Sequence, residues 1–406
     1  MILAETEKFT LRKKITDYAK SIGFDLVGFS PAKIEEKYLK AFEDWLGEGR
    51  EGTMEYMRKI EQRRDLTKIL PGAKSVIVFG MNYYREQPAL PRGHGRVARY
   101  AYGRDYHKVI GKKLKMVEKF IAENCASQIE AGSTSHFLPA VPPRGGHVNQ
   151  SPPLTKSYVD TGPLMERALA EQSGIGRIGK NGCVISKEFG SWIFLSEIIT
   201  TIDLSFESAK SSLGRIYGMD PKSARADFLV KKTAQESHSA STIPRTDRWS
   251  DPTQKSFNVC GNCNKCMTAC PTGAIIAPGV VDSRLCISYL TIENKEKIPT
   301  ALAKIIKKTK RLYGCDICQE VCPHNQARAK ASALSRPTHD YKTKRPDLRR
   351  DTLSPNSHDG LFTPIAGDSL NTKKIPTTDA TFLRTFAGSP VMRAKRKGLT
   401  RTARIF

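Results

Sequence analysis

Two short cysteine runs hold most of the residues that could bind a redox metal. The first, residues 260–271, has the spacing C-x2-C-x2-C-x3-C-P, and the second, residues 315–323, has the spacing C-x2-C-x3-C-P. Bacterial ferredoxins use this pattern to hold [4Fe–4S] clusters, and the cysteine before the proline binds the other cluster of the pair. The two-residue gaps allow a tight turn to aim several thiolates at one cluster, so the runs predict iron–sulfur chemistry.

The crossover of the last cysteine predicts two complete ligand sets. One cluster takes Cys260, Cys263, Cys266 and Cys322. The other takes Cys270, Cys286, Cys315 and Cys318. Structural zinc also binds four thiolates, but zinc ribbons have separate C-x2-C pairs rather than three cysteines in a row followed by Cys-Pro. The pattern therefore favours two [4Fe–4S] clusters, and Cys125 and Cys183 are expected to be ordinary buried thiols.

A single Asp-Thr-Gly triplet begins at Asp160. Aspartic proteases need two such carboxylates sharing a proton, and this chain has one triplet, so that chemistry is excluded. Asp160 is either an ordinary turn residue between a strand and a helix or a single buried general acid that protonates a leaving oxygen.

Two weaker motifs have ordinary explanations. The pattern Gly174-x-Gly176-x-x-Gly179 fits a dinucleotide fingerprint, but it follows a helical segment and precedes a strand, the reverse of the required context. We therefore interpret these glycines as positions where the backbone approaches a bulky ligand closely, rather than as a nucleotide site. His107 lies in a cluster of aromatic and charged residues at a predicted helix start, where capping or packing is favoured over metal binding.

Hydrophobic periodicity predicts the elements that position these residues. We expect helices over 8–22 and 107–124, a buried strand over 75–84, and a short strand, a turn and a helix capped by Thr161 within 158–182. The segments "CVIS" and "SWIFLSEIITT" are expected to form a hairpin through residues 187–190. Residues 126–157 and 205–256 lack a regular pattern and are interpreted as irregular insertions.

Charge and length restrict the class of protein. The chain has 406 residues, enough for two or three domains, and a net charge of +25, which favours a polyanionic partner such as nucleic acid. Residues 327–406 carry 17 Lys and Arg against six Asp, and Phe382 and Phe386 are expected to dock this basic tail on the body. No apolar run approaches the ~18 residues of a membrane span, and no export signal is present, so a cytoplasmic monomer without membrane contact is expected.

Several segments together resemble the epoxyqueuosine reductase family, cobalamin-dependent iron–sulfur enzymes of tRNA modification. The resemblance covers most of residues 8–326 and the end of the tail. It is carried by "LPGAKSVIVFGMNY", "YAYGRDYHKVI", "VDTGPLMERALAEQSGIGRIGKNG", the two cysteine runs, "RLCISYLTIENK" and "FAGSPVMRAKRKG".

The resemblance implies a reaction and its cofactors. Two [4Fe–4S] clusters, fed by an external low-potential electron donor, would reduce a bound cobalamin to cob(I)alamin. Epoxyqueuosine at the wobble position of a tRNA anticodon would then be reduced to queuosine, the last step of queuosine biosynthesis. Asp160 matches the proton donor of the family. Other matches to cobalamin-lining positions are Arg63, Ala98, Asn181, Val184, Leu195, Ser288 and Asp316, of which Ala98 offers contact alone.

The fold class implied is α+β, with an N-terminal α/β cobalamin-binding domain, a bacterial-type ferredoxin domain and a basic tail. The expected boundaries are 1–204 (with the insertion 126–157), the linker 205–256, 257–326 and 327–406. One alternative is a reductive dehalogenase-like enzyme, whose relatives usually carry a twin-arginine signal that is missing here. Others are a non-enzymatic ferredoxin-like electron carrier, which would leave some 200 residues without a purpose, and an RNA-binding protein with structural clusters.

Overall fold

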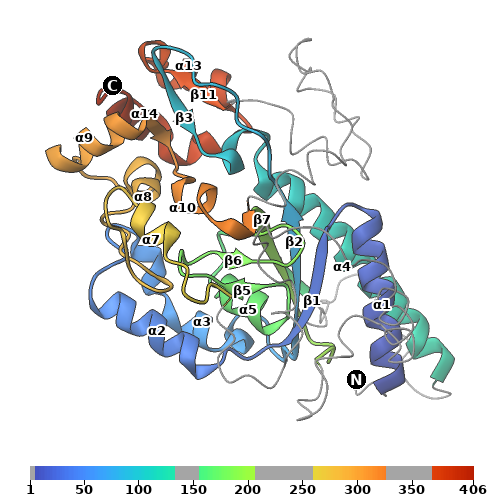
Figure 1. Ribbon diagram of the computed structural model, residues 1–406. Helices are drawn as coiled ribbons and strands as arrows, with labels where there is room; N and C mark the ends of the chain where they lie inside the picture. The colour runs from blue at the N-terminus through green and yellow to red at the C-terminus, as the bar shows by residue number, and fades with distance from the viewer. Residues whose placement is uncertain (1–4, 133–154, 206–258, 326–367) are drawn as a thin grey trace, which may run out of the picture.

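A four-stranded antiparallel sheet forms the centre of the N-terminal part (Figure 1). The computed structural model describes residues 5–132, 155–205, 259–325 and 368–406. The sheet has the order β1-β2-β7-β4, and its strands are β1 (Leu26–Pro31), β2 (Ser75–Asn82), β4 (Thr155–Tyr158) and β7 (Ile193–Thr200). β2 pairs with β7 along its whole length, from Ser75 opposite Thr200 to Asn82 opposite Ile193.

β2 is buried on both faces, which confirms the predicted buried strand. All eight of its residues are buried. Ile77 and Phe79 belong to one hydrophobic cluster and Val76 and Val78 to another, as the alternation of side chains along a strand requires. The sheet is therefore the shared wall of two cores.

Two long helices cover the first face of the sheet (Figure 1). They are α1 (Glu5–Ser21) and α4 (Tyr106–Gly132), which match the two helices predicted from periodicity. α4 buries Ile110, Leu114, Val117 and Ile121 at helical spacing against this face. On the second face lies α5 (Glu166–Gln172), which buries Ala168 and Leu169.

Two local predictions in the 158–201 region are wrong. Met165, not Thr161, precedes α5, and no side chain caps this helix. The short strand β6 (Val184–Ile185) pairs with β5 (Arg177–Ile178), and only an isolated bridge from Ser186 to Gly190 replaces the expected hairpin with β7. Since β7 is taken up by β2 and β4, it has no free edge for β6.

The first predicted insertion is shorter than its expected bounds. α4 continues to Gly132 and β4 begins at Thr155, so ordered elements occupy both ends of 126–157. Residues 133–154 lie outside the described part, as does nearly all of the linker 205–256. The smaller elements of the N-terminal part are α2 (Glu36–Gly47), η1 (Glu55–Arg58), α3 (Ile60–Arg64), η2 (Leu66–Lys68) and η3 (Arg99–Ala101).

The cysteine region is a chain of short helices and two-stranded pieces. Its elements are α7 (Lys265–Ala269), β8 (Ile275–Ala277), β9 (Val280–Val281), α8 (Ile287–Ile292), α9 (Thr300–Thr309), β10 (Arg311–Tyr313) and α10 (Ile317–Glu320). β8 and β9 pair with each other in an antiparallel hairpin. The cysteines fall on the loops and first turns of these elements, so the region presents thiols rather than a large core.

A second, three-stranded sheet joins all three parts of the chain. Its order is β10-β3-β11, in which β3 is His94–Val97 and β11 is Ser369–Asn371. β3 pairs in parallel with β10 of the cysteine region and antiparallel with β11 of the tail. The backbones are close, since a Cβ added to Gly95 would lie 2.6 Å from the Cβ of Leu312.

The end of the tail packs on this second sheet through η6 (Thr372–Lys374), α13 (Asp379–Phe386), η7 (Pro390–Ala394) and α14 (Lys395–Ala403). Phe382, Phe386 and Val391 are buried in one cluster with Val97 and Tyr313. The prediction that the two phenylalanines dock the tail is confirmed. Within the described residues, no helix combines the length and apolarity needed to cross a membrane.

We predict that Phe386→Ala lowers the free energy of unfolding by about 3–5 kcal/mol, because it leaves a cavity between the tail and the second sheet. Leu383 on the same helix is 52% exposed while Phe386 is 3% exposed, so Leu383→Ala is the matched control and should change stability by less than about 0.5 kcal/mol. Urea unfolding followed by circular dichroism measures both. Equal effects of the two substitutions would show that the tail is not part of the cooperative core.

Candidate active site

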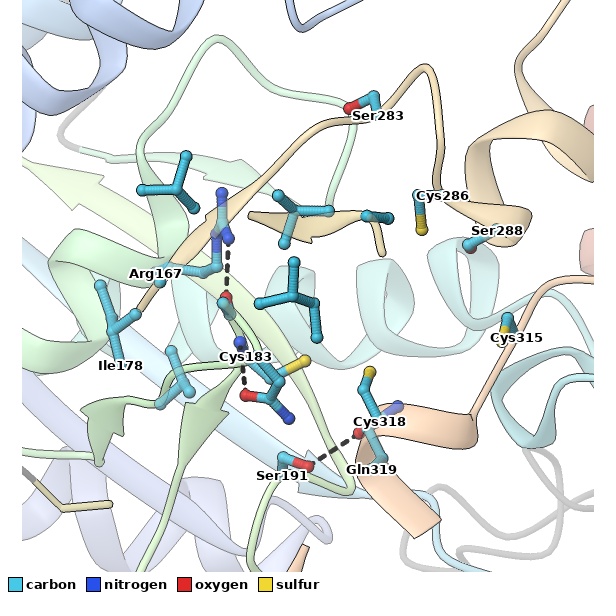
Figure 2. Close-up of a pocket in the computed structure, with 18 of the residues that line it drawn as sticks. Arg167, Ile178, Cys183, Ser191, Ser283, Cys286, Ser288, Cys315, Cys318 and Gln319 are labelled. Carbon is cyan, nitrogen blue, oxygen red and sulfur yellow. Dashed lines mark hydrogen bonds between the residues drawn. The ribbon is translucent and has the colours of Figure 1, made fainter. Parts of the chain in front are cut away.

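A large cavity of about 740 Å³ lies between the four-stranded sheet and the cysteine loops. One wall comes from the N-terminal part, including Trp45, Met54 and Leu195, and the other from Ile275, Val281 and Ser288 of the cysteine region. Figure 2 shows Cys183 and Arg167 on one side and Cys286, Cys315 and Cys318 on the other. The volume is in the upper part of the range for ligand sites, and most of the lining is apolar.

The first predicted ligand set is brought together outside this cavity. Cys322 and Cys260 belong to one small cluster with Ile185 and Val259. Burial raises the pKa of the Cys322 thiol to about 11, and the neighbouring Cys260 and Cys266 thiols contribute to the increase. Burial likewise raises the pKa of Cys266, with contributions from Cys260 and Cys263. The last cysteine of the second run thus lies beside the first run.

The second predicted ligand set faces the cavity. Cys270, Cys286, Cys315 and Cys318 all line it. Burial raises the pKa of Cys286, and Cys270 adds to the effect; burial also raises the pKa of Cys318, with contributions from Cys315 and Cys286. In the described residues no three His, Cys, Asp or Glu side chains surround the position of one metal ion. A cubane does not require such a group, because each thiolate binds a different iron atom.

Cys183 is a lining residue that the sequence did not identify. It was expected to be an ordinary buried thiol, yet it lines the cavity close to Cys318 (Figure 2). Burial raises the pKa of its thiol to about 11, so the group is neutral at physiological pH. In the sequence, Cys183 differs from an ordinary buried cysteine in that it directly follows the glycine-rich segment 174–182 and precedes β6.

Six of the eight carried-over positions line the cavity: Asp160, Asn181, Val184, Leu195, Ser288 and Asp316. Arg63 and Ala98 do not. Arg63 is 4% exposed and lies behind the lining, with its guanidinium 5.7 Å from the ring centroid of Phe42. Ala98 packs against the backbone of Gly314, since a Cβ added there would lie 2.6 Å from the Cβ of Ala98.

Asn181 offers a hydrogen-bond donor that the described protein atoms leave unused. Its Oδ1 accepts a hydrogen bond from the Cys183 amide at 3.1 Å, whereas its buried Nδ2 has no partner among them. Buried polar groups almost always find a partner. An unused donor in an apolar cavity fits a large ligand that carries polar groups on its edge.

Asp316 connects the cavity to an interdomain ion pair. It is 1% exposed and accepts hydrogen bonds from the Arg99 amide at 2.8 Å and from the Arg99 guanidinium at 3.2 Å. The same guanidinium donates to Glu320 at 2.8 Å. Burial raises the pKa of Asp316 although Arg99 acts in the opposite direction. Arg99 therefore fixes α10, and with it the second cysteine run, against the N-terminal part.

A second polar contact joins the two parts beneath the cavity. The Asn325 side chain accepts a hydrogen bond from the Ser191 amide at 2.8 Å and donates to the Ser191 hydroxyl at 2.9 Å. Ser191 in turn donates to Gln319 at 2.9 Å (Figure 2). Gly190 has a φ of 60°, and a Cβ there would collide with Asn325, so this turn admits only glycine.

Asp160 stands at the edge of the cavity on the loop after β4. Its φ is 58°, a left-handed conformation that aspartate adopts more readily than most residues. Its carboxylate accepts hydrogen bonds from the Tyr106 hydroxyl at 2.7 Å and lies 3.3 Å from Nε2 of His107. The side chain is 53% exposed, yet the protein around the carboxylate still desolvates it, so the acid is partly rather than fully buried.

The protonation state of Asp160 follows from these partners. Desolvation acts to raise its pKa, but the hydrogen bonds from His107 and Tyr106 outweigh it and lower the pKa below the usual value. Asp160 is therefore a carboxylate at rest. Tyr106 and His107 were not identified as site residues from the sequence, although they sit in the "YGRDYHK" cluster. Arg393 of the tail adds a positive charge near the same carboxylate.

Comparison with known proteins gives two matching family profiles. Residues 63–134 match "Epoxyqueuosine reductase QueG, DUF1730", and residues 259–325 match the "4Fe-4S double cluster binding domain". The second match covers the eight clustered cysteines and favours iron–sulfur clusters over structural zinc. It also follows the first along the chain, in agreement with the predicted α+β fold class.

Named relatives and solved structures give the same result. The epoxyqueuosine reductase of Gloeobacter violaceus is 33% identical over 96% of this chain and 94% of its own length. The epoxyqueuosine reductase of Cellulophaga algicola is 30% identical over 96% of this chain and 97% of its own length.

Among solved structures, epoxyqueuosine reductase with an epoxyqueuosine-modified tRNA-Tyr stem loop is 25% identical and has a TM-score of 0.64, with 98% of this chain and 81% of that chain covered. The structure of epoxyqueuosine reductase from Streptococcus thermophilus is 26% identical and has a TM-score of 0.61, with 97% of this chain and 80% of that chain covered. These findings favour the reductase over a dehalogenase-like enzyme or an electron carrier, and the chain belongs to the epoxyqueuosine reductase family.

Proposed function

We propose that this chain reduces epoxyqueuosine to queuosine at the wobble position of tRNA, with Asp160 as the proton donor. The observation that carries the proposal is the cavity itself, because one wall presents the second cysteine set and its edge presents Asp160. A reductive opening of an epoxide followed by loss of water needs electrons and protons at the same place. This arrangement supports a site that receives both.

The residues of the cavity fit the cofactors that the family uses, cobalamin and iron–sulfur clusters. Its volume, its apolar lining and the unused amide of Asn181 suit a corrinoid with polar edge groups. When bound, cobalamin would supply the two-electron reductant. We propose that Cys260, Cys263, Cys266 and Cys322 hold one cluster. We propose that Cys270, Cys286, Cys315 and Cys318 hold the other, on the cavity side.

The remaining roles belong to the chain itself. Asp160 would deliver a proton to the oxygen that leaves carbon, while the apolar lining excludes bulk water from the reacting atoms. Asn181, Val184, Leu195, Ser288 and Asp316 would hold the cofactor directly. Arg63 and Ala98 would act from behind the lining by supporting Phe42 and the Gly314 backbone.

The partners proposed are a tRNA and an external low-potential electron donor. The net charge of +25 supports a phosphate-led contact with RNA. The modified base would be extruded into the cavity while the phosphates position the molecule. With tRNA as substrate, the proposed setting is the cytoplasm, and we propose that a monomer is sufficient because both walls of the cavity come from one chain. We propose three domains, residues 1–204, 257–326 and 327–406, with residues 205–256 as the linker between the first two.

The central test is reconstitution under anaerobic conditions. We expect about eight iron atoms from two cubane clusters, one cobalt, and conversion of an epoxyqueuosine-containing stem loop to queuosine, measured by mass spectrometry of the released nucleosides. Cys266→Ala should lower bound iron, while Cys183→Ala is the matched control and should retain it. Uptake of iron without any corrinoid, or an unchanged epoxide with both cofactors present, would refute the proposed function.

We predict that Asp160→Asn retains iron and cobalt but lowers turnover by about 10²–10⁴-fold, the usual contribution of a positioned acid. The amide keeps the size of the side chain but cannot pass on a proton. Single-turnover rates measure the effect, with bound metal as the control for folding. Undiminished turnover would remove Asp160 from the mechanism.

We predict that Asn181→Asp weakens corrinoid binding roughly threefold to tenfold, because the substitution keeps the acceptor for Cys183 but removes the unused donor; the magnitude corresponds to one net hydrogen bond. Absorbance titration with hydroxocobalamin measures the dissociation constant. Asn264→Asp, on the exposed side of the first cysteine run, is the control. Unchanged affinity in Asn181→Asp would show that the amide does not face the ligand.

A further inference from the structure

His107 lies between two carboxylates. Its Nδ1 is 2.8 Å from Oδ1 of Asp105, and its Nε2 is 3.3 Å from Oδ2 of Asp160. The ring also stacks on Tyr106, with the centroids 4.1 Å apart. The three residues Asp105, Tyr106 and His107 are consecutive at the start of α4, so one turn of backbone fixes the whole group against the Asp160 loop.

The geometry decides the charge of this histidine. An ionised carboxylate only accepts hydrogen bonds, and a neutral imidazole has one nitrogen that cannot donate. Both ring nitrogens face carboxylate oxygens, so both carry a proton and the ring is an imidazolium. The two carboxylates raise the pKa of His107 to about 9, although desolvation, the largest single influence, acts to lower it.

Asp160 therefore rests as a carboxylate, and it needs a proton before it can donate one. We propose that His107 supplies this proton through the contact between Nε2 and the Asp160 carboxylate, so that Asp105, His107 and Asp160 form a proton relay into the cavity. This inference rests on the proposed function. His107 acts through Asp160 and is a positioning and proton-supplying residue rather than a catalytic one.

The proton transfers balance without a further reagent. As negative charge develops on the oxygen released from the epoxide carbon, the N–H bond at Nε2 breaks and its proton passes through the Asp160 carboxylate to that oxygen. Loss of the oxygen as water takes a second proton, which follows the same route after His107 has regained its own. Neutral His107 regains its proton from solvent, since its side chain is 30% exposed. The two electrons of the reduction come from the external donor already included in the proposed function.

The other groups around Asp160 are poorer proton sources. The Tyr106 hydroxyl donates a hydrogen bond, but burial and the neighbouring Asp160 raise its pKa far above the usual value. Arg393 contributes charge from the tail, and a guanidinium does not release its proton in this range. Burial raises the pKa of Glu166 and Glu197 well above normal, and no hydrogen bond joins either to Asp160 among the described contacts.

Other charged groups lie near His107 on its own helix, α4. Lys108, Lys112 and Lys115 line a shallow hollow together with His107 and Tyr158, and their positive charge opposes protonation of the ring. The negative charge of Asp105 favours protonation of the ring instead. Asp105 is held in place because its backbone amide donates a hydrogen bond to the Gly388 carbonyl of the tail at 2.6 Å. The carboxylates are in direct hydrogen-bond contact with the ring, so their influence prevails.

The first experiment titrates the imidazole without cofactors. We expect NMR of ¹⁵N-histidine-labelled protein, with the His107 signal assigned by its absence in His107→Gln, to give a midpoint near 9. Asp160→Asn should lower that midpoint, because one of the two carboxylates is lost. A midpoint at or below the ordinary 6.5, or no shift in Asp160→Asn, would overturn the relay.

The second experiment measures the pH profile of turnover. Because the charged ring is the active form, the wild-type rate should fall as pH rises through about 9. His107→Gln should lower the rate about 10²-fold, leave KM unchanged and abolish this fall. His94→Gln is the matched control, since His94 lies on β3 and contacts Ser369, and it should behave as wild type.

The outcomes separate the two proposals. A wild-type enzyme that binds iron and cobalt but makes no queuosine would refute the proposed function. An active wild type whose rate and pH profile are matched by His107→Gln, with unchanged bound metal and melting temperature, would refute the relay alone.

Discussion

The candidate active site depends on the seam that holds the cysteine region against the N-terminal sheet. The cavity has no complete wall in either part alone, because its lining alternates between the two. The polar contacts that hold this seam include those of Arg99 with Asp316 and Glu320, and of Asn325 with Ser191. Removing one partner of the Arg99 ion pair leaves an uncompensated buried charge, and removing one partner of the Asn325 contact leaves an unsatisfied polar group. These contacts therefore fix the relative position of the two walls as well as stabilising them.

Within that frame, the two ends of the cavity have opposite electrostatic character. On the cysteine side, desolvation raises the pKa values of a set of buried thiols. In this environment a bound metal cluster must supply the positive charge that compensates the thiolates. The Asp160 side is partly open to water and is stabilised by hydrogen bonds from Tyr106 and His107. In the proposed reaction, electrons and protons would therefore enter the cavity from different sides.

Much of the site could be predicted because it is encoded by spacing. The C-x2-C-x2-C-x3-C-P run predicts a cluster motif without any knowledge of the fold, and the neighbours of Cys322 are those that the crossover expects. The strand over 75–82 could be predicted because a short, continuous apolar run between turn residues is typical of a buried strand. The six carried-over positions that line the cavity came from the family resemblance.

The errors have a common cause, which is tertiary competition for partners. β6 could not be assigned because its pairing depends on β7 already being taken by β2 and β4. Arg63 and Ala98 sit one layer behind the lining, a difference in depth that position along the chain does not reveal. The ionised state of Asp160 depends on His107, a residue 53 positions away in sequence.

The β10-β3-β11 sheet has a consequence for biosynthesis. β3 is made early, but its neighbours are residues 311–313 and 369–371, so its edges stay unpaired on the ribosome until almost the whole chain has been translated. Assembly of the seam is thereby delayed to the final stage of synthesis. A chain interrupted before β11 would expose one edge of β3 and be a natural target for quality-control proteases.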